Sequence, residues 1–92
     1  MTSVPSNAIA TGQPNVSTSA TPIAPARPDR KRLTIINGGT ADVFIGGPNV
    51  TAANGALLAG TKGQSIVLET AAAVYGIVGA DTAAVSFIEE FA

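Results

Sequence analysis

From about residue 31 onward, short runs of β-branched and other apolar residues alternate with clusters of Gly, Asn, Asp and Thr. Runs of this kind, bounded by turn-forming residues, are typical of β-strands. The pattern predicts strands at 31–37, 41–46, 65–69, 73–78 and 83–90, and it allows a short one at 56–58. The expected fold is all-β, a small antiparallel β-sandwich or jelly-roll-like barrel of about five to six strands.

The segments between these runs predict how the strands connect. Residues 37–40 (NGGT) and 79–82 (GADT) are rich in residues that accept positive φ, so both are expected to close hairpins between antiparallel neighbours. Residues 46–64 contain Pro48 and several glycines, which exclude a continuous central strand there. This long segment is expected to carry the chain from one sheet to the other.

Period-two alternation within the strands separates two sets of apolar residues. The first set predicts the core and comprises Leu33, Ile35, Val43, Ile45, Ile66, Leu68, Val74, Val78, Val85 and Phe87. The second set lies on the opposite faces of the strands and comprises Ile36, Phe44, Val67, Tyr75, Ile77 and Ile88. These six are either scattered surface residues or an oligomer face. We expect the latter because a domain of about 63 residues buries only roughly 60% of the surface of its unfolded chain. A homo-oligomer, with a trimer favoured, or a monomer seated in a larger shell is predicted.

The N-terminal stretch has a different composition. Residues 1–28 are rich in Ser, Thr, Ala, Pro and Asn, with isolated apolar side chains such as Ile9, Val16 and Ile23 and no strand or helix period. The expected organisation is an extended or disordered N-terminal arm at 1–28 followed by a compact β-domain at 29–92. The arm is either a solvated tail or a segment that orders on a partner.

Charge changes this picture only locally. The net charge is −1, from five basic and six acidic residues, but four of the five basic residues lie at the joint between arm and domain: Arg27, Arg30, Lys31 and Arg32. Alternation places Arg30 and Arg32 on the face opposite Leu33. A nucleic-acid site is not expected because no aromatic residue interleaves with this cluster, and a membrane site is not expected because no amphipathic helix accompanies it.

Two interpretations of the basic cluster remain. It is a solvated group of charges that guards a strand edge, or it forms salt bridges with an acidic patch on a protein partner. The second interpretation predicts partner contacts by the cluster together with Ile9, Val16 and Ile23 of the arm.

Catalysis is not expected. The chain has no His and no Cys, so the commonest general base, transition-metal ligands and thiol nucleophiles are missing. Glu89 and Glu90 are neighbours in a predicted strand, so their side chains point to opposite faces and cannot act as a pair. The sequence therefore predicts no enzyme activity, no cofactor and no metal site. No apolar window reaches the roughly 20 residues that a membrane-spanning helix needs.

Several short motifs occur in a characteristic order along residues 32–90. They are Arg32, Leu33, Thr34, Ile35 and Asn37; then Val43, Ile45, Gly46 and Gly47; then Val50, Thr51, Asn54, Gly55 and Leu58; then Tyr75 and Ile77; and finally Val85 and Glu89. In this order the chain resembles small virion structural proteins of tailed bacteriophages. The resemblance leaves the arm unmatched and implies a head decoration or cement protein, or a head-fibre-like β-domain, without enzyme activity.

The functional expectation follows from this resemblance. The chain is expected to be a structural virion protein, a capsid decoration or cement protein that stabilises the phage head through its arm and β-domain. Its expected partner is the major capsid protein or another virion protein. Its expected location is the virion, with the phage head surface favoured, after assembly in the host cytoplasm. The alternative is a tail- or fibre-associated module that binds a receptor or glycan.

Overall fold

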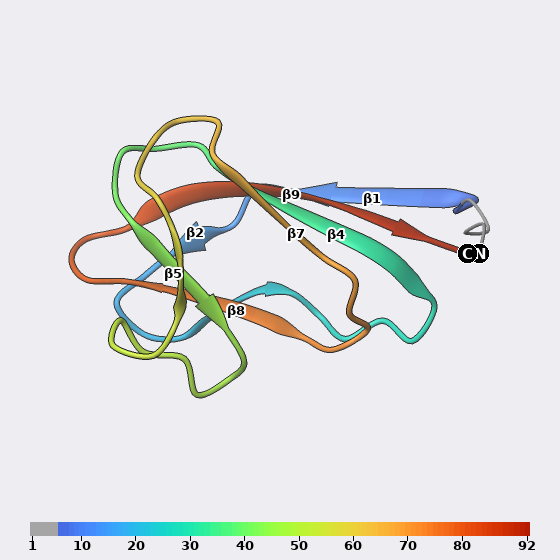
Figure 1. The fold of residues 1–92 in the computed structure, drawn as a ribbon, viewed down its shortest axis with the longest axis horizontal. Coiled ribbons are helices and arrows are strands. Elements are labelled where there is room, and N and C mark those ends of the chain that lie inside the picture. Colours follow the sequence, from blue (N-terminus) through green and yellow to red (C-terminus); the bar gives the residue numbers. More distant parts are fainter. Residues whose placement is uncertain (1–5) are drawn as a thin grey trace.

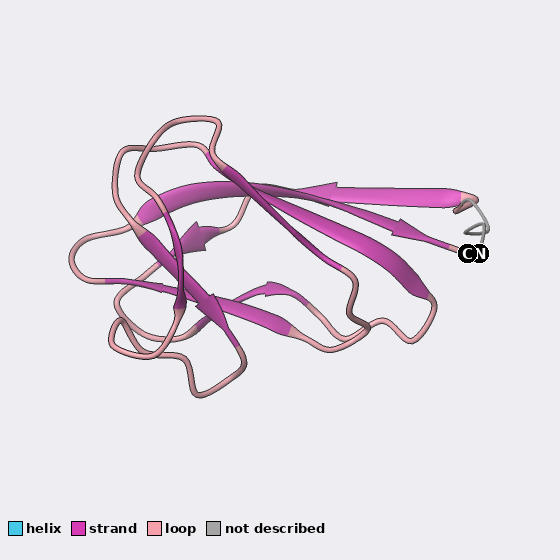
Figure 2. Ribbon diagram, viewed as in Figure 1, coloured by secondary structure: helices cyan, strands magenta, loops and turns pink. Residues whose placement is uncertain are grey.

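The structure is a computed structural model and describes residues 6–92. This part of the chain contains nine β-strands and no helix (Figure 2). The strands are β1 (Ala8–Gly12), β2 (Asn15–Val16), β3 (Thr21–Ala24), β4 (Arg30–Asn37), β5 (Val43–Gly46), β6 (Ala56–Leu58), β7 (Ser65–Leu68), β8 (Val74–Val78) and β9 (Ala83–Phe91). The prediction of an all-β fold is confirmed.

The strands form two antiparallel sheets that pack as a sandwich, not as a closed barrel (Figure 1). The five-stranded sheet has the order β1-β9-β4-β7, and β2 also pairs with β9; the four-stranded sheet has the order β3-β8-β5-β6. The longest strand, β9, pairs with β1 over its second half and with β2 at its start. The ribbon formed by β1, β9 and β4 extends at one end beyond the other sheet (Figure 1).

The core lies between the sheets and contains all ten residues that alternation predicts there. Seven of the ten belong to the buried cluster, and Ile66, Leu68 and Phe87 pack against it. Leu33 and Ile35 of β4 are 0% exposed. Full burial of one such side chain stabilises a fold by about 1.5–3 kcal/mol. The apolar face of each strand therefore determines how the sheets are stacked.

The N-terminal segment belongs to this sandwich. β1 and β2 pair with β9, and β3 pairs with β8, so residues on both sides of position 28 share both sheets. Val16 and Ile23 of this segment are 0% and 5% exposed and join the core cluster. Their burial and the pairing of the edges of β8 and β9 offset the entropy of ordering the segment. The segment has the extended backbone expected of an arm, but from residue 8 it packs in the domain; residues 1–5 of the predicted arm lie outside the described residues.

Both hairpin predictions are wrong. β4 pairs with β7 and β9, whereas β5 pairs with β6 and β8, so residues 37–40 lead from one sheet to the other, and residues 79–82 do the same between β8 and β9. Asn37 explains the first turn: its buried amide donates to the carbonyl of Ala41 at 2.9 Å and accepts from the N–H of Gly39 at 2.9 Å. The segment 46–64 does carry the chain from one sheet to the other, as predicted, with β6 on its way.

Candidate functional site

The predicted basic joint contains a buried ion pair. The side chains of Arg30 and Glu89 are 0% and 2% exposed, and an Nη atom of Arg30 lies 2.8 Å from Oε2 of Glu89. The Arg30 guanidinium also donates to the carbonyl oxygens of Thr70 and Ala72, both at 2.9 Å, and to that of Pro25. A buried charge is tolerated when it is paired and its donors are satisfied, as they are here. Arg30 therefore holds the 70–72 segment against the start of β4.

A β-bulge explains why Arg30 faces inward although alternation predicts it on the outer face. In the pairing of β4 with β9, Arg30 lies opposite Phe91 and Arg32 lies opposite Glu90, so Lys31 is the extra residue. An extra residue in one strand reverses the direction of the side chains that precede it. The predicted placement of Arg30 beside Arg32 is wrong for this reason.

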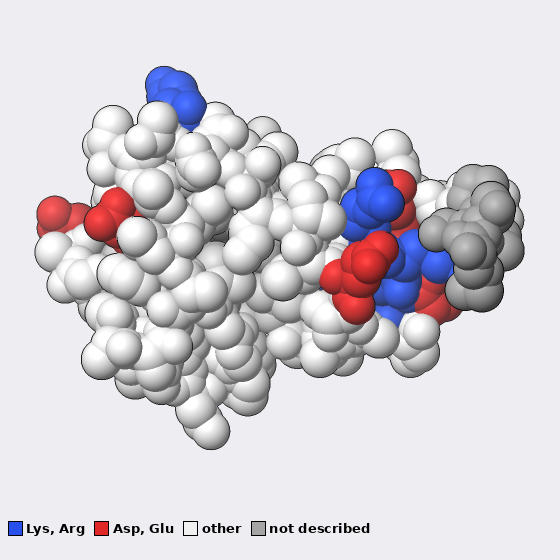
Figure 3. All heavy atoms as spheres, viewed as in Figure 1, with Lys and Arg blue, Asp and Glu red and all other residues white. Residues whose placement is uncertain are grey.

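Arg27 completes the charged cluster. Its Nε donates to Oε2 of Glu89 at 3.1 Å, and its guanidinium carbon lies 4.0 Å from the ring centroid of Phe91. Charged side chains gather at this end of the molecule, where β9 ends (Figure 3). Arg27 and Arg30 thus bind a glutamate within the chain, whereas Lys31 and Arg32 are exposed. Partner binding by the two exposed residues stays a prediction.

The apolar residues that were expected to contact a partner have different surroundings. Ile9 on β1 is 64% exposed and is available to a partner. Val16 and Ile23 are core residues, which leaves their side chains no surface to offer in this structure.

The six residues of the predicted oligomer face do not share one surface. Ile36, Val67 and Ile88 lie on the outer side of the five-stranded sheet, whereas the other three lie on the outer side of the four-stranded sheet, with the core between the two groups: Phe44, Tyr75 and Ile77. Val67 is 54% exposed, but Ile77 is only 9% exposed. A single interface through all six is therefore incompatible with the fold. The homo-oligomer itself, and the trimer, stay predictions.

Within residues 6–92, every buried side-chain nitrogen and oxygen has a hydrogen-bond partner. The same residues contain no group of three or more His, Cys, Asp or Glu side chains that could hold a metal ion. They also contain no helix of the length and apolar character needed to cross a bilayer.

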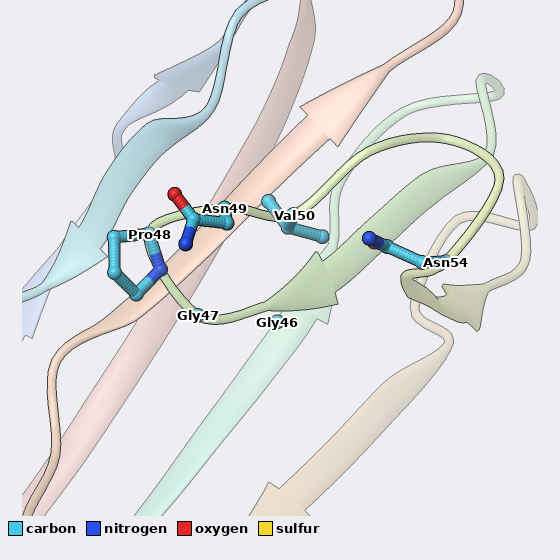
Figure 4. A pocket seen from close by; sticks show the side chains of 6 residues that line it. All are labelled: Gly46, Gly47, Pro48, Asn49, Val50 and Asn54. Atoms are coloured by element: carbon cyan, nitrogen blue, oxygen red, sulfur yellow. The ribbon is translucent and has the colours of Figure 1, made fainter.

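A surface pocket lies in the loop that joins β5 to β6. It has a volume of about 290 Å³ and is lined by Gly46, Gly47, Pro48, Asn49, Val50 and Asn54. Figure 4 shows the loop curling back over the end of β5, with the Asn54 amide directed toward Val50 and Asn49 beside Pro48. No charged residue lines the pocket, so the pocket suits an uncharged ligand.

Hydrogen bonds within the loop fix the walls of this pocket. The backbone N–H of Thr51 donates to Oδ1 of Asn54 at 2.7 Å, and the N–H of Asn54 donates to the hydroxyl of Thr51 at 3.2 Å. The N–H of Val50 donates to the carbonyl of Gly47 at 3.0 Å. The Asn49 amide and the Nδ2 group of Asn54 form no hydrogen bond with another described residue, whereas Oδ1 of Asn54 is held by Thr51. Sequence analysis identifies this stretch only as an irregular segment, because the Thr51–Asn54 pairing that shapes it is a property of the folded loop.

Comparison with known proteins gives one informative result. No protein-family model and no curated protein matches the chain. Among solved structures, the chain is similar to the stem and receptor binding domain of the spike protein P1 from bacteriophage PM2, with a TM-score of 0.59 and 26% sequence identity. The similarity covers 88% of this chain and 32% of that structure, so the chain spans about a third of the length of the spike structure.

This similarity confirms the coarser part of the sequence-based resemblance. The chain is structurally similar to a virion protein of a bacteriophage, and both the N-terminal strands and the later strands are needed to account for a match over 88% of the chain. The finer expectation of a head decoration or cement protein of a tailed phage is not shown. The chain therefore shares its fold with about a third of a phage spike structure.

Proposed function

We propose that the chain is a structural protein of a bacteriophage particle and forms part of a spike that binds the host receptor. The observation that carries this proposal is the similarity, over 88% of the chain, to the stem and receptor binding domain of a phage spike. It supports the receptor-binding alternative raised by the sequence better than the capsid-decoration role, because the matched protein is a spike. The decoration role also relies on an arm that is free to reach a neighbour, whereas here residues 8–24 belong to the sandwich.

The loop between β5 and β6 is the surface that we assign to the receptor. The first and last strands pair with Ala8 opposite Phe91, so the chain enters and leaves the sandwich at one end. The β5–β6 loop lies away from that end (Figure 1), where attachment through the termini would leave it accessible. Its pocket of about 290 Å³ is large enough for a small ligand group.

The chemistry of the loop suits an uncharged polar receptor such as a carbohydrate. A side-chain amide offers two donors and one acceptor, which match the hydroxyl groups of a sugar. Asn49 supplies such an amide, Asn54 supplies the donors of its Nδ2 group, and Val50 supplies an apolar wall. The segment 43–61 carries no charged residue, which argues against a phosphorylated or otherwise ionic receptor. Small-ligand sites combine a concave surface with a few placed polar groups in this way.

The test is competition for adsorption between the purified chain and the phage that encodes it. An excess of the chain should slow adsorption of the phage to its host cells in proportion to the dose. Asn49→Ala removes an exposed amide of the pocket and should weaken the competition, whereas Gln64→Ala removes an exposed amide of a different loop and should not.

Antibodies against the chain separate the two parts of the proposal. Labelling of intact particles is expected from a surface spike, and its absence would rule out a place on the virion surface. Labelling without any competition for adsorption would retain the structural role and refute the receptor role. Equal loss of competition in both amide variants would refute the assignment of the pocket.

A further inference from the structure

The free edge of β7 is the starting point for a second proposal. β7 (Ser65–Leu68) is the outermost strand of the five-stranded sheet and pairs within the described residues with β4 alone. Its sequence, SIVL, contains no charge and no proline. Proteins usually guard such an edge with a charge, a proline, a bulge or a very short strand, because its unpaired N–H and C=O groups can bind another strand.

Two other sheet edges show how this chain guards an edge. The edge strand β3 contains Pro22, and the register of its pairing with β8 shifts between Pro22 and Ala24. The opposite edge of the same sheet, β6 (Ala56–Leu58), has only three residues. β7 has neither device, and its outward side chain Val67 is 54% exposed. The edge of β7 is therefore open to pairing.

An apolar groove runs beside this edge, between the two sheets. It has a volume of about 280 Å³, and its walls include Ile66 and Leu68 of β7 and Ile45 and Val74 of the four-stranded sheet. Ile66 and Leu68 face the core but are only half-buried, in contrast to the inward residues of β4. A strand added beside β7 would place every second side chain over this groove, because side chains alternate between the faces of a sheet.

Charges at the two ends of β7 indicate which strand fits. Lys62 precedes β7 and Glu69 follows it; both are exposed, and neither takes part in an ion pair within residues 6–92. Lys62 lies in the turn that precedes the strand, whereas Glu69 directly follows it, so the two charges lie beyond opposite ends of β7. Antiparallel pairing with the same segment of another copy brings each lysine toward the other copy's glutamate. Parallel pairing would bring like charges together.

We propose that β7 pairs antiparallel with β7 of a second copy of this chain, so that the two five-stranded sheets become one continuous sheet. A two-fold axis perpendicular to the sheet keeps inward residues on the inner face, so Ile66 and Leu68 of each copy cover the groove of the other. The Val67 side chains meet on the outer face. Such an isologous contact closes at two copies and gives a dimer, unlike the trimer that the sequence favours. The proposal does not depend on the receptor role.

The first test is the mass of the purified chain in solution, measured by light scattering over a dilution series. The dimer has twice the chain's 9.1 kDa. Val67→Lys places a charge on the exposed edge without touching the core, and it should reduce the mass to 9.1 kDa. The matched control is Leu57→Lys, because Leu57 is 58% exposed on the other sheet, and this variant should remain a dimer. Circular dichroism verifies that both variants are folded.

A charge exchange provides the second test. Lys62→Glu places like charges near both ends of the paired strands and should raise the dissociation constant severalfold, because an attraction at each end of the dimer becomes a repulsion. Adding Glu69→Lys to Lys62→Glu restores opposite charges and should recover most of the affinity. A chain that stays monomeric at its highest soluble concentration, a trimer, or a dimer that Leu57→Lys dissociates and Val67→Lys does not would overturn the proposal.

Discussion

Replacement of Glu89 by Gln tests the buried ion pair between the start of β4 and the end of β9. The substitution keeps the shape of the side chain but leaves the Arg30 charge uncompensated in a site where its side chain is 0% exposed. Removal of one partner of a buried pair costs about 3–5 kcal/mol. Because Arg30 retains its bonds to the carbonyls of Pro25, Thr70 and Ala72, we expect the lower end, about 3 kcal/mol.

This loss is measurable by urea denaturation and by thermal unfolding. A decrease of about 3 kcal/mol in the free energy of unfolding should lower Tm by about 12–24 °C in a domain of this size. The control is Glu90→Gln on the same strand, whose side chain lies on the opposite face and forms no ion pair within the described residues; its cost should stay below about 0.5 kcal/mol. Combining Glu89→Gln with Arg30→Ala should cost less than the sum of the single changes, because both remove the same interaction. Equal stability of Glu89→Gln and Glu90→Gln would refute the reasoning.

Two further substitutions test how the sheets and turns are held. A Cβ at Gly76 would lie 2.7 Å from Cδ1 of Ile23, so Gly76→Ala should lower the free energy of unfolding by about 1–3 kcal/mol. The control is Gly79→Ala. A Cβ at Gly79 has no atom within 4 Å, so this variant should not be destabilised by overpacking. Similar stabilities of the two variants in urea would show that β3 does not pack on β8 as described. Asn37→Ala removes the buried amide that bonds to Ala41 and Gly39, so it should lower the free energy of unfolding by about 3 kcal/mol in the same urea assay. A decrease of less than about 0.5 kcal/mol would contradict the role of Asn37 in the turn.

The core could be predicted from the sequence because strands that bury one face show it as period-two alternation. Alternation failed at Arg30 because the bulge at Lys31 shifts the register by one residue, and no local pattern reports a bulge. The same alternation does contain a signal for the ion pair. On β9, alternation places Glu89 on the same face as Val85 and Phe87, which are predicted core residues. The sequence therefore already indicates a carboxylate on the core face.

The N-terminal strands could not be predicted from their own composition. β1 and β3 consist mainly of Ala, Thr, Gly, Pro and Ile, and their strand conformation depends on pairing with β9 and β8 rather than on intrinsic propensity. The hairpin predictions failed for a related reason. The residues of a turn indicate where the chain changes direction, but not which sheet the next strand joins. After β4, this depends on the buried Asn37 amide, which bonds to the carbonyls of Ala41 and Ala59.

The pocket of the β5–β6 loop likewise depends on the folded structure more than on the local sequence. Glycine and proline at 46–48 mark a loop in the sequence, but its hollow arises from the reciprocal bonds between Thr51 and Asn54 and from the return of the chain over β5. The open edge of β7, in contrast, could be read from the uncharged run SIVL once its place at the edge of the sheet was known.

Hydrogen exchange of the isolated protein most directly tests whether the N-terminal strands belong to the sandwich, which distinguishes a spike domain from a capsid clamp with a free arm. If residues 8–24 are part of the fold, the amides of β1, β2 and β3 that pair with β9 and β8 should exchange slowly without any partner. Their protection should be lost together with that of β9 when the protein unfolds. If these amides exchange at the rate of an unstructured peptide while β4 and β9 stay protected, the segment is a free arm and the structure described here is wrong for it.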